Sequence, residues 1–194
     1  MGNCLFYVWQ THISIHYSLH LCHSHSRLDR KRGEWPELFP ALFRFAGHAN
    51  ASVRQSAFSV FHQLADVVGG ELFDPYMSVV KTVLEKGLAD SATGVVLAAV
   101  QATSAFLSVI DRDDATNMNA FRTLLPAMMA FLKSSVEQGR NDDAQATLEV
   151  FVDISDACPA FFRPSLRSFV VTIGTICRAA ALPFGLFYLT ALPR

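Results

Sequence analysis

A two-helix pattern that recurs every 40 to 50 residues or so constrains the fold of this chain more than any other feature. The first copy covers residues 35–70, and its apolar residues are spaced three and four positions apart. Gly69 and Gly70 can end the second helix, and Ser52 is the predicted N-cap at its start. The apolar residues are Leu38, Phe39, Leu42, Phe43 and Phe45 in the first helix and Val53, Ala57, Val60, Phe61, Leu64 and Val68 in the second. Faces this wide predict packing against further helix pairs.

Two more pairs and half of another follow along the chain. The predicted helices are Tyr76–Leu88 with Ala92–Ile110, then Asn117–Val136 with Asp142–Cys158, and finally Pro164–Arg178. Because they occur inside first helices, Pro40 and Pro126 predict bends. The last second helix is expected to bury Leu148, Phe151, Val152 and Ile154. Helix pairs at this spacing are typical of HEAT and armadillo repeats, so the predicted fold is all-α, a right-handed α-solenoid of about three and a half HEAT-type antiparallel helix pairs.

The net charge of −1 is the sum of three regions with different charge. Residues 1–33 carry +3, residues 34–160 carry −8 and residues 161–194 carry +4. An acidic central region favours a basic protein partner over nucleic acid. The chain has 4 cysteines and no CxxC pair, which indicates reduced thiols in an intracellular protein; Cys158 and Cys177 are expected to fill the core.

The two ends differ from the helical centre. We expect residues 1–33 to be an unrelated leader, disordered or weakly docked, residues 34–178 to form the repeat array, and residues 179–194 to be an apolar truncated tail. Within the leader, Thr11–Cys22 alternates like a strand. Two other roles for the leader are possible interpretations: lipidation at Met1–Cys4, and a metal site. The metal site would be formed by His12, His16, His20, His23, His25 and Cys22. The basic run Arg27–Arg32 is a linker or a nuclear-localisation patch.

No catalytic, cofactor or metal site is predicted, and the chain is not expected to be an enzyme. Ser59, His62 and Asp66 share one helix, but side chains along one helix face rarely converge on one reacting atom. The sequence contains no phosphate-binding glycine loop, and no basic patch with interleaved aromatic residues occurs in residues 34–160. The tail run Ala179–Leu192 is too short and too interrupted to span a membrane. We therefore expect no nucleic-acid or membrane partner, and low solubility unless the tail's apolar surface is covered.

Four segments carry a family resemblance. Phe39–Phe43 and Ala51–Ala57 resemble a HEAT repeat, with a proline in the first helix and a Val-Arg pair opening the second. With Asp142–Phe151 and Ala160–Leu166, the repeats resemble the importin-beta (karyopherin) family over about Trp35 to Arg178. The resemblance implies a nuclear import receptor found in cytoplasm and nucleus, here as a fragment or alternatively spliced form. It also implies Phe-Gly nucleoporins as partners, and Ran-GTP only in the full-length family context.

Carboxylates near the ends of the second helices are the candidate cargo site. Stacked second helices line one face of a solenoid, and an acidic track on that face would attract Lys- and Arg-rich cargo of the histone or ribosomal-protein type. Phe43, Met77 and Met129 are candidate nucleoporin contacts by position, with core packing as the alternative. The alternative function is a generic HEAT scaffold without transport activity. The cargo-binding candidates are Asp66, Asp111, Asp113, Asp114, Asp142, Asp143, Glu149, Asp153 and Asp156.

Overall fold

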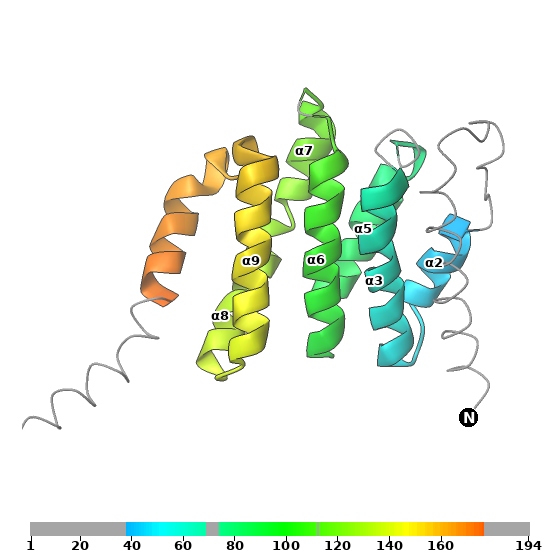
Figure 1. Cartoon of the computed structure of the whole chain (residues 1–194), viewed down its shortest axis with the longest axis horizontal. Helices are drawn as coiled ribbons and strands as arrows, with labels where there is room; N and C mark the ends of the chain where they lie inside the picture. The colour runs from blue at the N-terminus through cyan, green and yellow to red at the C-terminus, as the bar shows by residue number, and fades with distance from the viewer. Residues whose placement is uncertain (1–37, 69–73, 112, 177–194) are drawn as a thin grey trace, which may run out of the picture. The chain divides into compact units, whose positions relative to one another are not determined.

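A computed structural model describes residues 38–68, 74–111 and 113–176 (Figure 1). Over these residues the chain contains helices and no strand, so the all-α prediction is confirmed. It divides into two compact units with the boundary after Val109, called unit 1 and unit 2 below. The leader with its strand pattern and histidines, the glycine pair after the second helix and the apolar tail lie outside the described residues.

Unit 1 begins with an antiparallel helix pair, α2 (Leu38–Ala46) and α3 (Ala51–Val68). The α3 residues predicted to face inward are buried from Val53 to Leu64, whereas Phe45 of α2 is exposed. Asn50, and not the predicted Ser52, caps α3: its Oδ1 accepts a hydrogen bond from the Ser52 N–H at 2.9 Å. Pro40 lies in the first turn of the described helix, where no backbone N–H is needed, and does not interrupt it.

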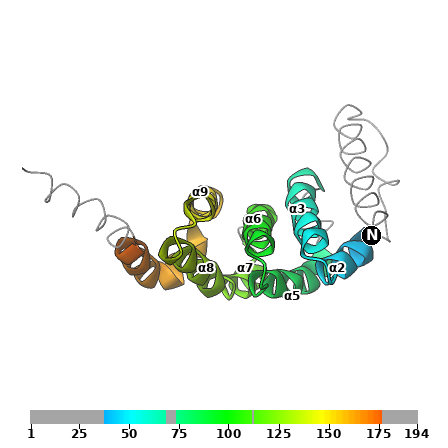
Figure 2. The same ribbon diagram turned by 90° about the horizontal axis from the view of Figure 1, so that it is seen from below.

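The second pair of unit 1 packs directly on the first. A short 3-10 turn at Asp74–Tyr76 leads into α5 (Met77–Leu88), and α6 (Thr93–Val109) follows. α6 packs along both α3 and α5, and α2 packs on α3. α3 and α6 therefore form one layer of unit 1, and α2 and α5 the other (Figure 2). Most residues of α6 are buried, which fits a helix with neighbours on several sides.

Aromatic rings and one glycine join the helices of unit 1. The Phe61 ring of α3 lies 5.8 Å from Phe43 of α2 and 6.2 Å from Phe106 of α6. Gly87 of α5 is buried beside Phe58 of α3, and a Cβ at this position would lie 2.8 Å from Ala99 Cβ of α6. The close approach of the three helices therefore depends on the missing side chain.

Unit 2 begins with a first helix that is broken in two. The single helix predicted over Asn117–Val136 is α7 (Ala115–Arg122) and α8 (Leu125–Glu137), separated by a turn at Thr123 and Leu124. Pro126 is in the first turn of α8. A proline there cannot donate to the carbonyl four residues earlier and its ring clashes with that carbonyl, which disrupts the helix at this point. The expected bend is therefore a complete break.

α9 (Asn141–Ala157) is the second helix of this pair and packs against α8. Phe151 and Ile154 are buried as predicted, but Leu148 and Val152 are exposed, which corrects that part of the prediction. After two 3-10 turns at Pro159–Phe161 and Arg163–Ser165, residues 166–176 form the helix that begins a fourth pair. Phe169 of this helix contacts Phe151 and Phe162 at ring distances of 5.2 and 4.5 Å. As predicted, Cys158 is buried in the core.

Candidate functional site

The structure separates the nine candidate carboxylates into groups. Asp111, Asp113 and Asp114 lie between α6 and α7, outside any helix. Asp142, Asp143, Glu149, Asp153 and Asp156 belong to α9. Asp66 is in the last turn of α3, and its side chain is outside the described part of the structure. The predicted continuous track therefore reduces, within the described residues, to one loop and one helix.

Four of these carboxylates share one face of α9. Glu149, Asp153 and Asp156 follow Asp142 by 7, 11 and 14 positions. At 3.6 residues per turn, these spacings place all four residues within about 60° around the helix axis. All four side chains are exposed. Only Glu149 has a described polar partner, the Gln145 amide, whose Nε2 donates to Oε1 at 3.0 Å. These four residues are called the α9 acidic stripe.

The helix itself does not compensate the charge at the C-terminal end of this stripe. Asp153 and Asp156 lie in the last turns of α9, and the last turn contains no basic residue. Helix C-termini carry partial negative charge, so carboxylates there oppose the helix dipole and cost stability. None of the four forms an ion pair within the described residues. A cation supplied from outside would therefore be favoured at this end of the helix.

Asp143 and Asp114 have structural partners. Asp143 Oδ2 accepts a hydrogen bond from Arg140 Nη1 at 2.8 Å, in the turn before α9. Asp114 caps α7, accepting from the Asn117 N–H at 3.0 Å, and this bond is the main cause that lowers the pKa of Asp114. In the same loop, Asp111 Oδ1 accepts from the Asp113 N–H at 3.1 Å. These contacts organise the ends of helices and make Asp143 and Asp114 weaker candidates for cargo binding.

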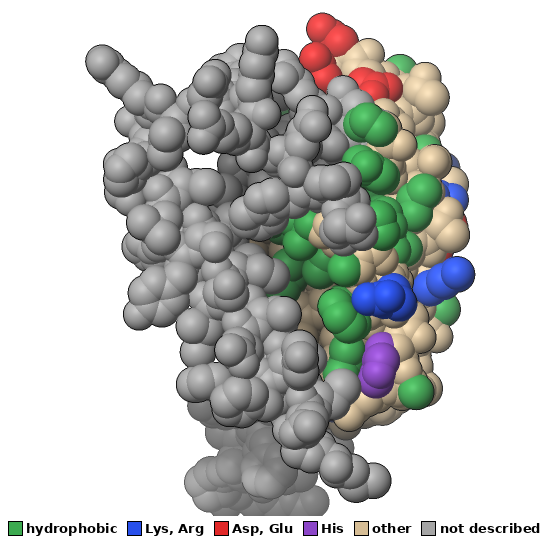
Figure 3. All heavy atoms as spheres, turned by 90° about the vertical axis from the view of Figure 1, so that its right-hand side faces the viewer, with side chains coloured by type: hydrophobic (Ala, Val, Ile, Leu, Met, Phe, Trp, Pro, Cys, Tyr) green, Lys and Arg blue, Asp and Glu red, His purple; other side chains and the backbone are tan. Residues whose placement is uncertain are grey.

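The second-helix layer of unit 1 has a different surface. The described α6 contains no charged residue, and its more accessible positions include Gln101, Ser104 and Ser108. On α3, Gln55 is exposed and Gln63 half-buried. Figure 3 looks onto the α2 side of the structure and shows apolar side chains beside Lys or Arg side chains and a histidine, with Asp or Glu side chains at the top of the view. An acidic track is therefore not a feature of the described second helices of unit 1.

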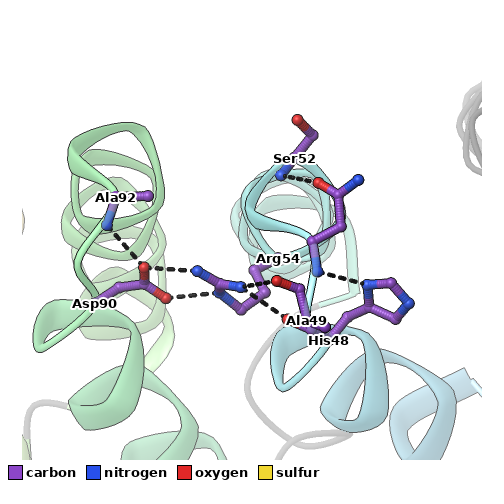
Figure 4. A network of polar contacts seen from close by, with 7 residues as sticks. His48, Ala49, Ser52, Arg54, Asp90 and Ala92 are labelled. Atoms are coloured by element: carbon purple, nitrogen blue, oxygen red, sulfur yellow. Dashed lines mark hydrogen bonds and ion pairs between the residues drawn. The ribbon is translucent and has the colours of Figure 1, made fainter.

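A polar network that the sequence did not reveal connects the two pairs of unit 1 (Figure 4). Arg54 of α3 binds Asp90, in the loop before α6, through two hydrogen bonds: Nε to Oδ2 at 2.6 Å and Nη2 to Oδ1 at 2.8 Å. Arg54 Nη1 also donates to the carbonyls of His48 and Ala49, at 2.8 and 2.9 Å. Asp90 Oδ1 accepts a further bond from the Ala92 N–H at 2.9 Å.

This network has electrostatic consequences for both partners. The hydrogen bonds from Arg54 hold the pKa of Asp90 below its ordinary value, with a further contribution from the Ala92 N–H. The hydrogen bond to Asp90 in turn raises the pKa of Arg54. Because the pair joins residues 36 positions apart and satisfies the loop carbonyls of the first pair, its role is structural.

Ser59, one of the residues weighed for catalysis, is hydrogen-bonded to its own helix. Ser59 Oγ donates to the Gln55 carbonyl at 3.2 Å, within its own helix. In the described residues, no three His, Cys, Asp or Glu side chains are grouped so that they could hold a metal ion. Nor does any helix there have both the length and the apolar character needed to cross a membrane.

The helix pairs match a known family. A family model described as IPO5-like, TPR repeats, matches residues 23–172. The chain belongs to this family. A curated relative, the probable importin-5 homolog of Dictyostelium discoideum, is 22% identical over 131 residues, which cover 67% of this chain and 12% of that protein. The resemblance to the importin-beta (karyopherin) family is therefore confirmed at the level of the family.

Solved karyopherin structures share the fold of this importin-5-like chain. Kap121p bound to the SUMO protease Ulp1p is similar with a TM-score of 0.58 and 19% identity, over 73% of this chain and 13% of Kap121p. Kap121p bound to Nup53p is similar with a TM-score of 0.56, with the same identity and coverage. The predicted solenoid of HEAT-type helix pairs is therefore confirmed. The chain spans about an eighth of the length of these relatives.

The nucleoporin candidates of the importin-5-like repeats are largely internal. Met77 is buried, while Met129 is half-buried. Phe43 is half-buried and stacks on Phe61. Exposed apolar side chains on the first helices of unit 1 are instead Phe45 of α2 and Val79 of α5. Helical periodicity alone could not distinguish these positions, because residues at the edge of an apolar face are buried or exposed according to the neighbouring helix.

Proposed function

We propose that this chain is part of a nuclear transport receptor and that the α9 acidic stripe binds a Lys- and Arg-rich segment of protein cargo. The observation that carries the proposal is the position of Asp153 and Asp156 at the C-terminal end of α9, exposed and without a basic partner in the described residues. Natural helices more often place cations at this end. Retaining carboxylates there costs stability and supplies a site for an external cation.

Membership in the importin-5-like family supports transport as the context for this binding. Kap121p has been crystallised with a SUMO protease and with Nup53p, which shows that a protein of similar fold binds other proteins. We propose basic cargo of the histone or ribosomal-protein type, and movement between cytoplasm and nucleus. Phe-Gly nucleoporins would contact the first helices near Phe45 and Val79. Ran-GTP would bind only a longer receptor, and the proposed role involves no enzymatic step.

Within the family, we infer an importin-4-type receptor. The inference rests on a resemblance of Asp142–Phe151 and Ala160–Leu166 to repeats in the N-terminal third of importin-4. Sequencing of the transcript beyond both ends of this chain tests the assignment. Flanking repeats that resemble another receptor more closely would contradict it.

Charge reversal on the stripe tests cargo binding. We expect the double variant Asp153→Lys/Asp156→Lys to bind a labelled Lys/Arg-rich peptide about tenfold more weakly than the parent chain, because two attractive charges become repulsive. Fluorescence anisotropy between about 50 and about 300 mM NaCl measures this, and binding to the parent should weaken with salt. Lysines at a helix C-terminus favour the helix, so a loss of binding would not result from unfolding.

Glu137→Lys is the matched control. Glu137 is an exposed carboxylate of the same unit, on α8, and is not part of the α9 acidic stripe. Its reversal should leave peptide affinity within about twofold. Equal affinities of the parent and the double variant would reject the stripe as the cargo site. Binding that does not respond to salt would favour a scaffold that recognises its partner by other contacts.

A further inference from the structure

Two aspartates three positions apart occur twice in this chain, and both times an alanine follows the second aspartate directly. The two copies of this Asp-x-x-Asp-Ala pattern are residues 111–115 and residues 153–157. Endoproteases of the caspase class cleave after an aspartate, favour a second aspartate three residues earlier, and accept a small residue after the cut. Basic side chains in their pockets recognise the two carboxylates by charge and geometry. The sequence alone therefore contains two equivalent candidate cleavage sites.

The first copy lies in the loop between α6 and α7 and at the start of α7 (Figure 1). The described residues among 111–117 are all exposed or half-buried. The nearest buried side chains along the chain are Ile110 before this segment and Met118 after it. Exposed loops with small and polar residues are preferred places for proteolytic cleavage. A protease can therefore take up this segment without exposing any of the core.

A few hydrogen bonds at the start of α7 hold this loop. The Asp114 N–H donates to the Asp111 carbonyl at 3.0 Å, and the Asp114 carbonyl accepts from the Met118 N–H at 3.1 Å. The Asp114 carboxylate accepts from the Asn117 N–H at 3.0 Å. A protease binds its substrate extended, so these bonds must open before cleavage. All of them belong to one surface turn, and such turns open locally without unfolding the rest of the protein.

The second copy is in a different environment, because all of its residues belong to α9. Ile154, inside the pattern, is only 1% exposed, and Cys158, directly after it, is also buried. The Ile154 carbonyl accepts a hydrogen bond from the Cys158 N–H at 2.8 Å. An extended conformation here would unwind the end of α9 and expose both buried side chains to water. The structure thus distinguishes two sites that the sequence does not.

We propose that the peptide bond between Asp114 and Ala115 is a processing site for an endoprotease of the caspase class, and that α9 protects the second copy. Water is the only co-reactant. The bond between the Asp114 carbonyl carbon and the Ala115 nitrogen breaks, the carbon gains the hydroxyl group of water, and the nitrogen gains the proton. The cut separates α7 from its Asp114 cap and leaves a positive ammonium group at the helix N-terminus, where the dipole disfavours it. Cleavage therefore loosens the first helix of unit 2, independently of the proposed cargo site.

The test treats the full chain with a purified executioner caspase and follows the products by mass spectrometry. Fragments 1–114 and 115–194 are expected. Synthetic peptides of residues 107–119 and 149–161 show how fast each copy is cut without the fold. The rate in the folded chain, divided by the rate in the matching peptide, should be at least about tenfold higher for Asp114 than for Asp156, because one surface turn opens more often than a helix end with buried side chains.

Three variants identify the residues that the protease reads. Asp114→Asn should abolish the cut, and because asparagine caps a helix as well as aspartate does, the loss would not result from a changed fold. Asp111→Asn should slow cleavage, whereas Asp113→Asn, the control inside the same loop, should leave the rate unchanged.

Several results would overturn the inference. One is a 107–119 peptide that the protease does not cut, which would show that the pattern is not recognised. Another is a folded chain that stays intact, or one in which Asp156 is cut as readily as Asp114 relative to its peptide. Cleavage of Asp114→Asn at the same bond would assign the loop to a protease of another specificity.

Discussion

Gly87 shows how a single residue sets the distance between helices in unit 1. Its hydrogen faces the Phe58 ring and the Ala99 methyl group, on two different helices. Phe58 is itself almost completely buried. The sequence placed this glycine inside a helix, where glycine is usually a weakness. Its purpose became visible only when the neighbours from two other helices were known.

We expect Gly87→Ala to lower the free energy of unfolding by about 1–3 kcal/mol, because the added methyl group overpacks the contact with Phe58 and Ala99. Urea unfolding followed by circular dichroism measures the change. Gly174→Ala is the control, since no atom lies within 4 Å of the added Cβ. In the exposed 166–176 helix, alanine should be neutral or stabilise by up to about 1 kcal/mol. Equal effects of the two substitutions would contradict this account.

Sequence reasoning did not identify the side-chain partners that polar residues find within the fold. Asp143 and Arg140 are three positions apart, a spacing that could have suggested their ion pair from the sequence. Arg54 and Asp90 are 36 positions apart and had no such signal. The α9 acidic stripe, in contrast, follows from helical periodicity once the helix is known.

Helices were predicted well because apolar spacing identifies them, but their ends and breaks depend on local chemistry. The second helices expected at Ala92–Ile110 and Asp142–Cys158 differ from α6 and α9 by one residue at each end. The break at Pro126 and the exposure of Val152 were not anticipated. The break depends on the backbone N–H that Pro126 lacks. The exposure of Val152 depends on which neighbouring helices cover α9.

The cap of α3 offers an element-level test. Replacing Asn50 by Ala should reduce the free energy of unfolding by about 1 kcal/mol, since the Ser52 N–H loses its side-chain acceptor. Asn50→Asp should restore most of that loss. Ser52→Ala is the control and should stay within about 0.5 kcal/mol of the parent chain, because Ser52 is exposed. A larger effect at Ser52 than at Asn50 would show that the cap is misassigned.

At the scale of the whole molecule, the repeat period predicted the array of helix pairs and the family. The second helices begin at Ala51, Thr93 and Asn141, close to the spacing of about 40 and 50 residues expected from the sequence. The proposed cargo surface is less continuous than the charge of −8 over residues 34–160 suggested. Charge summed along a chain does not indicate on which helix face the carboxylates lie.

Acid should destabilise the whole fold in a defined direction. The pKa values of Asp90 and Asp114 are lowered in the folded chain, so their stabilisation is complete above the ordinary aspartate pKa of about 3.9 and is lost as the pH falls through the lower folded values. Urea midpoints at pH 7 and about pH 3 measure this. Asp90→Asn should cost about 1–2 kcal/mol at pH 7 and show a smaller further loss in acid. An acid dependence identical to the parent would exclude Asp90 as a source.

The bond between Arg54 and Asp90 also restricts how these repeats can be recombined. Arg54 uses its guanidinium to satisfy carbonyls at the end of one helix pair while it holds the loop that starts α6 in the next. A lysine has no planar fork and could not make both sets of contacts. If the first helix pair is joined to a foreign repeat, the new repeat must supply a hydrogen-bond acceptor for Arg54. The same holds for a gene in which an exon boundary falls between α3 and α5.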